Sequence, residues 1–409
     1  MKKEDALPVV IAGGGPAGMM AGLLFARAGV RTIVLEKHND FLRDFRGDTV
    51  HPSTLDLFGE LGLLDALLAR RHDKVPTIGA VIAGQPYAIA DFRRLPGKAR
   101  FIAMMPQWDF LDFVAEQARR FPAFSLRMGE EATGLLAGAR RIEGVRLASG
   151  ETIRAALVIA ADGRDSALRD AAGLPRQDLG APIDILWFRV PKERTPDNRT
   201  QGYVDGGEMI ITIDRGDYFQ CARVIAKGTA EKVRAEGIER FCKDVAATVP
   251  ALAGEIGAIT RWEDVKRLTV SLDRLTRWNR PGLLAIGDAA HAMSPVGGVG
   301  INLAIQDAVA AANILAEPLL QGADPDPLLQ RVERRRMLPV KVIQSLQRII
   351  HRRVIGAAMR SRTPRAPALV RVLQIIPPLQ GIPARLLGLG IRREHILSPQ
   401  APAKARPGQ

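Results

Sequence analysis

The first part of the chain alternates short apolar runs with turns and helical stretches. Pro8 to Ala12 is an apolar run that ends at the turn GGGPAG, a helical spacing of apolar residues continues to Ala28, and Thr32 to Leu35 is a second apolar run. Short apolar runs without alternation are typical of strands buried on both faces. The order predicts a strand, a glycine turn, a helix and a second, parallel strand.

The turn between the first strand and the helix has the spacing GxGxxG. Gly13 allows a tight turn, Gly15 lets a pyrophosphate approach the backbone, and Gly18 lets the helix pack on the strand. The second strand ends at Glu36, a position from which a carboxylate accepts hydrogen bonds from an adenosine ribose. The alternative is a plain βαβ crossover. Because the complete unit is present, dinucleotide binding is the favoured interpretation, through Gly13, Gly15, Pro16, Ala17, Gly18, Glu36 and Lys37.

Two later apolar runs end at acidic residues. Leu157 to Ala161 leads into Asp162 in the segment ADGRDSALR, and Leu283 to Ile286 leads into the segment GDAAH with Asp288. In an open α/β sheet, ligands bind outside the carboxyl ends of the strands. We therefore expect both acids at the same edge of the sheet as the glycine turn.

Together with GGGPAG, the segments ADGRDSALR and GDAAHAMSPVGGVGINLAIQDA resemble the class A flavoprotein aromatic hydroxylases, the family of para-hydroxybenzoate and phenol hydroxylase. The resemblance runs from about Pro8 to Leu315 and implies an α/β fold. In that fold a Rossmann-like FAD-binding domain is interleaved with a β-sheet substrate domain, and a C-terminal helical region follows. It also implies an FAD monooxygenase that uses NADH or NADPH and dioxygen to hydroxylate or epoxidise a small aromatic or hydrophobic substrate through a flavin hydroperoxide.

The resemblance assigns cofactor contacts residue by residue. Asp162 with Gly163 supports the FAD site and the route of the nicotinamide, and Gly287 with Asp288 holds the ribityl chain. Arg46 and Gln107 match, more loosely, residues that contact FAD. Neither cysteine lies in these segments, so non-covalent FAD is expected. The residues expected around the ring are Pro295, Gly298, Gly300, Ile301 and Asn302.

The segment after the second acid makes chemical sense for a flavin. Pro295, Gly297, Gly298 and Gly300 permit close backbone approach to a flat ring. A helix starting near Val299 would direct its amides at the ring edge, where reduced flavin is negatively charged. We therefore expect Pro295 and Gly298 to act in catalysis. Taken alone, the segment is equally consistent with a glycine loop that only closes the sheet.

His51 is the third candidate for a catalytic role, because it could orient a phenol or take its proton. Pro52 and Ser53 follow it and indicate the start of a helix, so capping or packing is the favoured interpretation. The six histidines show no spacing typical of metal ligands, and no metal is expected.

The strand-rich middle of the chain contains the candidates for the substrate pocket. Apolar residues alternate with polar ones in segments such as DILWFRV, as in a half-exposed sheet. Such residues are more often core than ligand contacts. The candidates for the ceiling of the pocket are Trp187, Met209, Ile211 and Phe219.

The order of these signals predicts two discontinuous domains. FAD-binding segments are expected at 1–75, 96–180 and 275–320, and the β-rich substrate domain at 76–95 and 181–274. A basic helical region is expected at 321–398, and a disordered tail rich in Ala, Pro, Lys and Arg at 399–409.

Charge is distributed unevenly along the 409 residues. The net charge of +14 lies mostly in residues 317–409, which contain 17 basic and 5 acidic residues. Without a recognisable module, nucleic-acid binding ranks last. The basic amphipathic pattern of 328–359 favours a helical cap, with a monomer or homodimer, over attachment to an anionic membrane surface. With only two cysteines and no long uncharged apolar stretch, we expect a cytoplasmic protein, peripheral to a membrane if it meets one.

Two alternatives to a soluble aromatic hydroxylase remain open from the sequence. One is a membrane-peripheral flavin oxygenase or reductase that acts on an isoprenoid or quinone. The other is a flavin-binding protein without turnover.

Overall fold

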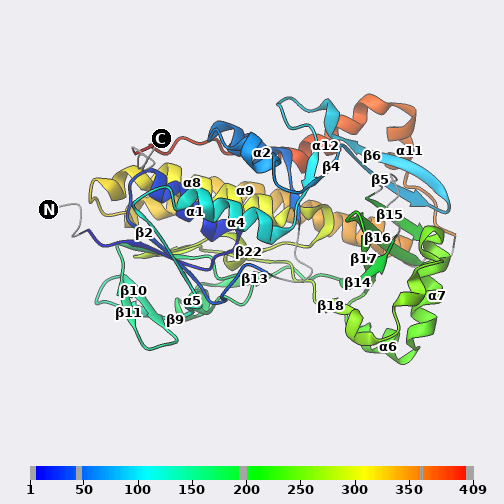
Figure 1. Cartoon of the computed structure of the whole chain (residues 1–409), viewed down its shortest axis with the longest axis horizontal. Coiled ribbons are helices and arrows are strands. Elements are labelled where there is room, and N and C mark those ends of the chain that lie inside the picture. Colours follow the sequence, from blue (N-terminus) through cyan, green and yellow to red (C-terminus); the bar gives the residue numbers. More distant parts are fainter. Residues whose placement is uncertain (1–5, 43–47, 193–199, 360, 362, 402–409) are drawn as a thin grey trace.

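The centre of the fold is a six-stranded, mainly parallel sheet (Figure 1). The computed structural model describes residues 6–42, 48–192, 200–359, 361 and 363–401. From edge to edge the strands are β20 (Asn279–Arg280), β21 (Leu283–Ala285), β12 (Leu157–Ala160), β1 (Val9–Ala12), β2 (Thr32–Glu36) and β8 (Phe124–Met128). β1 pairs in parallel with β12 and β2, so all three sequence motifs follow strands that end at one edge.

One face of this sheet is covered by a layer of helices. The helices are α1 (Pro16–Arg27), α4 (Gln107–Ala118), α8 (Gly300–Leu320) and α9 (Asp326–Ile349). α1 lies between α4 and α8, and α9 packs on the outer side of α8 (Figure 1). By length and composition the stretch Val296–Leu320 could cross a membrane, but 78% of its apolar window is buried inside the protein, as in a core helix.

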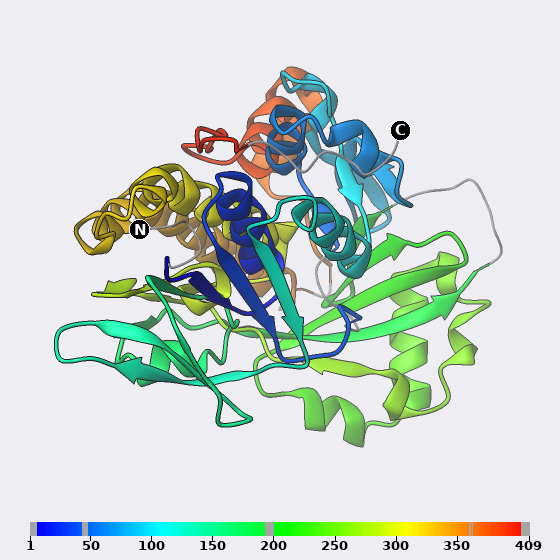
Figure 2. The same ribbon diagram turned by 60° about the vertical axis from the view of Figure 1, so that its left-hand side comes forward.

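A second, seven-stranded sheet lies beside the first (Figure 2). Its strands, in order, are β18 (Lys266–Leu268), β14 (Ile183–Pro191), β17 (Tyr218–Ala226), β16 (Glu208–Asp214), β15 (Gln201–Asp205), β5 (Thr77–Ile82) and β6 (Gln85–Asp91). β5 pairs in parallel with β15, so two segments far apart in sequence complete one sheet. The outer face of this sheet packs against α7 (Ile238–Thr248), which follows α6 (Ala230–Ala235).

Three small sheets complete the strand structure of the described residues. They are β3 (Thr49–Val50), β7 (Ile102–Met104) and β4 (Asp73–Val75); β9 (Ala132–Ala137), β10 (Ile142–Leu147) and β11 (Thr152–Arg154); and β13 (Arg176–Asp178), β19 (Asp273–Leu275) and β22 (His291–Ala292). Between them lie α2 (Pro52–Glu60), α3 (Leu64–Leu68) and α5 (Ala167–Ala171).

Two helical segments of the chain are interrupted at glycines. The stretch from Thr54 to Leu68 divides into α2 and α3 around Gly62, with φ 69°, and the stretch from Glu231 to Val249 divides into α6 and α7 at Gly237, with φ 92°. Positive φ is incompatible with a helix, and glycine adopts it at little cost.

The C-terminal region wraps back over the molecule. After α9 the chain forms the π-helix η7 (Ile350–Ile355), α10 (Gly356–Ala358), α11 (Ala368–Ile375), the turn η8 (Pro377–Gln380) and α12 (Gly381–Gly388). α11 and α12 pack on β6, and Ala401 then donates a hydrogen bond to the Arg27 carbonyl at the end of α1. Residues 399–401 of the expected disordered tail are thus ordered against α1, because Arg27 also donates to the carbonyls of Ser398 and Pro399. The rest of that tail, 402–409, lies outside the described residues.

Candidate cofactor and substrate site

The glycine turn has the shape that a dinucleotide requires. A Cβ atom on Gly13, where φ is 104°, would collide with the Ala161 carbonyl, and a Cβ on Gly18 would collide with the Gly13 carbonyl. A Cβ on Gly15 would meet no atom within 4 Å. The first and third glycines therefore permit close packing, while the second borders open space in front of α1, where Pro16 and Ala17 begin the helix. Amides at a helix N-terminus bind phosphate groups there.

Glu36 is held at the end of β2, beside this turn. Its carboxylate accepts hydrogen bonds from the Gly14 amide at 2.9 Å and the His38 amide at 3.0 Å. These two bonds fix the orientation of the carboxylate beside the glycine turn. Lys37 is more exposed and lies 3.9 Å from Glu131, at the rim of the site.

An arginine connects the loops that contain the two acids, Asp162 and Asp288. Asp162 accepts hydrogen bonds from the Ser166 hydroxyl at 2.5 Å and the Leu168 amide at 3.2 Å. These bonds act to lower the pKa of Asp162, but burial outweighs them and raises it. Arg164, two residues beyond Asp162 and next to Gly163, donates to Asp288 at 3.0 Å. The ion pair joins the loops after β12 and β21, at the edge where ligands bind in such sheets.

The loop from Pro295 to Gly300 depends on its glycines. Gly297 and Gly298 have φ values of 81° and 62°, and a Cβ on Gly298 would collide with the Thr49 hydroxyl. That hydroxyl donates to the Gly298 carbonyl at 2.8 Å. α8 then begins at Gly300 without a side-chain cap, so the amides of its first turn, including that of Ile301, are available to a ligand.

The side chain of Asn302 connects the glycine loop to β3 and α2. Its Oδ1 accepts hydrogen bonds from the His51 amide at 2.9 Å and the Thr54 hydroxyl at 2.7 Å. Its Nδ2 donates to the carbonyls of Thr49 and Gly298 at 3.1 and 3.2 Å. Both side-chain amide atoms are therefore bonded to the protein, and the side chain holds the loop against β3. The cofactor contact expected for Asn302 stays a prediction, which its backbone amide in the first turn of α8 can still serve.

His51 is fully buried, at the residue before α2. Its Nδ1 lies 2.8 Å from the Leu387 carbonyl, to which a neutral ring donates, and burial lowers its pKa to about 4. No side-chain cap is formed. A group that exchanges a proton with a substrate must be reachable, so the structure favours packing over the catalytic role and over capping.

Gln107 begins α4, where its backbone bonds to Asp48, and Asp48 forms an ion pair with Arg215 of the second sheet. Burial raises the pKa of Asp48 to about 6, against the attraction of Arg215. Gln107 thus lies where the two sheets meet. Arg46 lies outside the described residues.

The candidates for the pocket ceiling divide between the two faces of the seven-stranded sheet. Trp187, Met209 and Ile211 pack on the face that also contacts Val296 of the glycine loop. Phe219 packs with Phe188 on the opposite face, against α7, so its assignment to the ceiling is wrong. The register explains the error: Phe219 pairs with Val190 and Asp214, and Ala222 occupies the position beside Trp187.

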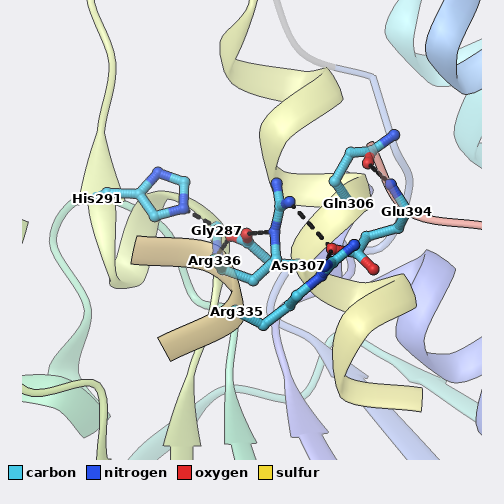
Figure 3. Close-up of polar contacts among 7 residues, drawn as sticks. All are labelled: Gly287, His291, Gln306, Asp307, Arg335, Arg336 and Glu394. Atoms are coloured by element: carbon cyan, nitrogen blue, oxygen red, sulfur yellow. Dashed lines mark hydrogen bonds and ion pairs between the residues drawn. The ribbon is translucent and has the colours of Figure 1, made fainter. Parts of the chain in front are cut away.

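A buried ionic network lies behind the GD turn (Figure 3). Asp307 accepts hydrogen bonds from the Gly287 amide at 3.1 Å and from Arg336 at 2.9 Å, and its other contact is His291 at 2.6 Å. Burial opposes ionisation of Asp307, but the charges and bonds of His291 and Arg336 outweigh it and lower its pKa. Arg336 also contacts Glu394, at 3.3 Å. The network joins α8, α9 and the C-terminal segment to the start of the GD turn.

Sequence reasoning missed several of these residues. Asp307 lies inside the quoted motif and could have been noticed as a helical acid in an otherwise apolar stretch. Arg336 is one of three consecutive arginines and nothing in the pattern distinguishes it. Glu394 had a signal, because it is the single acid after Glu333 in a basic region.

Comparisons with known proteins agree with this geometry. The family model described as FAD binding domain matches residues 6–345. The chain is similar to 6-methylpretetramide 4-monooxygenase of Streptomyces rimosus, with 31% identity over 382 residues that cover 89% of this chain and 91% of the relative. It is also similar to 3-demethoxyubiquinol 3-hydroxylase of Escherichia coli, with 26% identity over 82% of this chain and 87% of that one. PqsL of Pseudomonas aeruginosa, solved with 2-aminobenzoylacetate, shares the fold with a TM-score of 0.74, 21% identity, and coverage of 87% and 97%.

The residues present fit the cofactor that this family binds. Gly13 and Gly18 allow the tight turn, Gly15 borders open space in front of α1, and Glu36 is oriented beside the turn. The first turn of α8 is uncapped behind a loop in which Gly297 and Gly298 have positive φ. With the family match and these features in agreement, the chain belongs to the FAD-binding domain family and is an FAD-dependent monooxygenase of the aromatic hydroxylase class.

Proposed function

We propose that this enzyme hydroxylates a planar, fused-ring aromatic compound, with NADH or NADPH and dioxygen as co-substrates. The observation that carries the proposal is the face of the seven-stranded sheet on which Trp187, Met209 and Ile211 pack together with Val296 of the glycine loop. These side chains are only partly buried. An apolar face of this kind suits an apolar aromatic ligand. The similarity to an enzyme named for 6-methylpretetramide supports the same substrate class.

Bound FAD, once reduced by the pyridine nucleotide, supplies the activation of dioxygen for transfer of one oxygen atom to a substrate carbon. The chain's part is to hold and to shield. The turn from Gly13 to Gly18 would hold the pyrophosphate and Glu36 the adenosine ribose. Asp162 and the pair of Arg164 with Asp288 would border the middle of the cofactor.

The loop from Pro295 to Gly300 and the start of α8 would act at the ring. Amides at a helix N-terminus stabilise negative charge, so those of α8 would favour the anionic reduced ring. The apolar face above the loop would exclude water, which protects reactive oxygen species from unproductive decay. In this proposal Pro295 and Gly298 would line the reacting position. His51 holds the loop in place through the hydrogen bond of its amide to Asn302.

The test is stimulation of NADH or NADPH oxidation by aromatic compounds. The purified yellow protein is assayed with phenols, quinolones, fused-ring polyketides and prenylated quinones, and the products are identified by mass. We expect the fused-ring compounds to stimulate oxidation most. Oxidation that no compound in the panel stimulates would contradict the proposal.

A contact with anionic membranes is supported by one further observation. Leu369, Ile375 and Ile382, in α11 and α12, are 71%, 78% and 65% exposed. The surrounding sequence from Arg348 to Arg393 contains arginines and no acid. Exposed apolar side chains among basic ones favour an anionic lipid surface. We expect flotation with phosphatidylserine vesicles that is lost in a triple serine variant of these residues and kept in Leu397→Ser, an equally exposed site outside the region.

A further inference from the structure

The end of α9 changes its winding directly behind the glycine loop. Residues Ile350–Ile355 form a π-helix, and α10 continues the segment to Met359. π-turns are rare and occur frequently at functional sites, because the extra residue redirects side chains that a regular α-helix would place elsewhere.

A buried polar stripe on α9 fixes this segment to the glycine loop. Gln347 accepts a hydrogen bond from the Ser294 amide at 3.1 Å and donates to the carbonyls of Ser294 and Val296, each at 2.9 Å. His351 lies 2.9 Å from the Ser294 hydroxyl, and Gln344 donates to the Ala292 carbonyl at 3.2 Å. These side chains of α9 and η7 are at most 2% exposed. The position of the π-turn is therefore set relative to Pro295.

The same segment presents apolar side chains to the substrate sheet. Ile355 is buried among residues of β14 and β17, and Ile350 and Met359 pack on that cluster while remaining partly exposed. The tip of the β15–β16 hairpin also reaches the segment, since a Cβ on Gly207 would lie 3.4 Å from the Met359 carbonyl. The partly buried apolar side chains around this cluster thus include residues of the sheet, of the glycine loop and of the segment Ile350–Met359.

A buried nitrogen gives this cluster a polar feature. Trp187 Nε1 has no hydrogen-bond partner among the described residues, although the atom is buried. An unpaired buried N–H is costly, and a ligand oxygen would satisfy it. A planar aromatic compound with a phenolic or carbonyl oxygen matches both the apolar side chains and this donor.

We infer that the segment Ile350–Met359 forms a third wall of the substrate site, and that Ile350 and Met359 set the size of the ring system it accepts. The inference rests on the proposed aromatic substrate. Gln347 and His351 attach this wall to the loop at Pro295. The distance between the wall and the reacting position is therefore fixed. These two are positioning residues in this account.

The test compares two neighbouring isoleucines. Ile350 packs on the cluster, whereas Ile349 is 53% exposed on the outer side of the helix. The FAD-loaded variants Ile350→Ala, Ile350→Phe and Ile349→Ala are titrated with naphthol, hydroxyanthraquinone and anhydrotetracycline. Dissociation constants come from the change in flavin absorbance, without turnover. Ile350→Val, a smaller change, is included in case either Ile350 variant fails to fold.

We expect Ile350→Ala to shift the ratio of dissociation constants about tenfold toward the larger rings and Ile350→Phe to shift it toward naphthol, as expected for a change of a few carbon atoms in an apolar pocket. Ile350→Val should move in the direction of alanine, and Ile349→Ala should match the wild type. Binding by the wild type with identical ratios in all Ile350 variants would overturn the wall but leave the proposed function intact. A wild type that binds none of the three probes would overturn both.

Discussion

The two large sheets bury their side chains in different ways. In the six-stranded sheet every residue of β1 and β12 is buried, so each strand is apolar throughout and is covered on both faces. In the seven-stranded sheet β14 divides its side chains between two separate clusters, and all residues of β15 are only partly buried. The first sheet therefore has a strong sequence signal, and the second has a weak one.

The two sheets also differ in the molecule that each would bind. The first sheet holds motifs whose chemistry is set by a shared cofactor, and its glycines and acids have few substitutes. In the proposed function, the second sheet would meet the substrate with apolar side chains that many residues could replace. Family membership follows from the motifs of the first sheet. In our proposal, substrate choice would depend on the second sheet and on the C-terminal segment that covers it.

The first prediction separates the two glycines of the turn. Gly18→Ala should destabilise the protein by roughly 3 kcal/mol, because its Cβ would collide with the Gly13 carbonyl. Gly15→Ala should unfold like the wild type without FAD, since its Cβ meets no atom within 4 Å, but should bind FAD more weakly. Urea unfolding of the apoproteins and FAD titration measure the two quantities. Equal destabilisation by both changes would contradict this division.

The next prediction concerns the network behind the GD turn. Arg336→Met leaves the buried Asp307 without its arginine partner, which should cost about 3 to 5 kcal/mol. The exposed neighbour Arg334 provides the control, and Arg334→Met should have little effect. Urea unfolding of the two variants checks the prediction, and equal stabilities would refute it.

A pH effect is expected from His51. Its pKa is about 4 in the folded protein, below the ordinary value of 6.5, so the unfolded chain binds the proton more tightly. The neutral ring therefore does not reduce the free energy of unfolding above pH 6.5. As the pH falls from 6.5 toward 4, the free energy of unfolding decreases by about 3 kcal/mol at most. His51→Gln should flatten the pH dependence of the unfolding free energy over that interval. An unchanged slope would show that the ring is not buried as a neutral group.

The smallest effect contrasts the two faces of the second sheet. Trp187→Leu should weaken binding of a fused-ring aromatic several-fold, because Trp187 packs on the face toward Val296. Phe219→Leu, on the face toward α7, should leave that affinity unchanged while lowering stability slightly. Ligand titration of both variants tests this prediction. A larger loss of affinity in Phe219→Leu than in Trp187→Leu would contradict a pocket on the face toward Val296.

Sequence reasoning went furthest where backbone geometry requires particular residues. Gly13, Gly18 and Gly298 could be identified because no other residue fits their conformations or contacts. It went less far where a role depends on partners distant in the chain. The side chain of Asn302 is occupied by residues about 250 positions away, and Arg164 is paired across the edge of the sheet. Phe219 was misplaced because a shift of one residue moves a side chain to the opposite face of a strand.

The central claim, that the chain is an FAD monooxygenase, is tested most directly by the origin of the oxygen in its product. The enzyme is incubated with NADH or NADPH and a fused-ring phenol under isotopically heavy dioxygen, and in parallel in heavy water under ordinary dioxygen. The account predicts a product with one heavy oxygen atom from dioxygen and none from water. Label from water alone, or a product that gains no oxygen while the pyridine nucleotide is consumed, would contradict it.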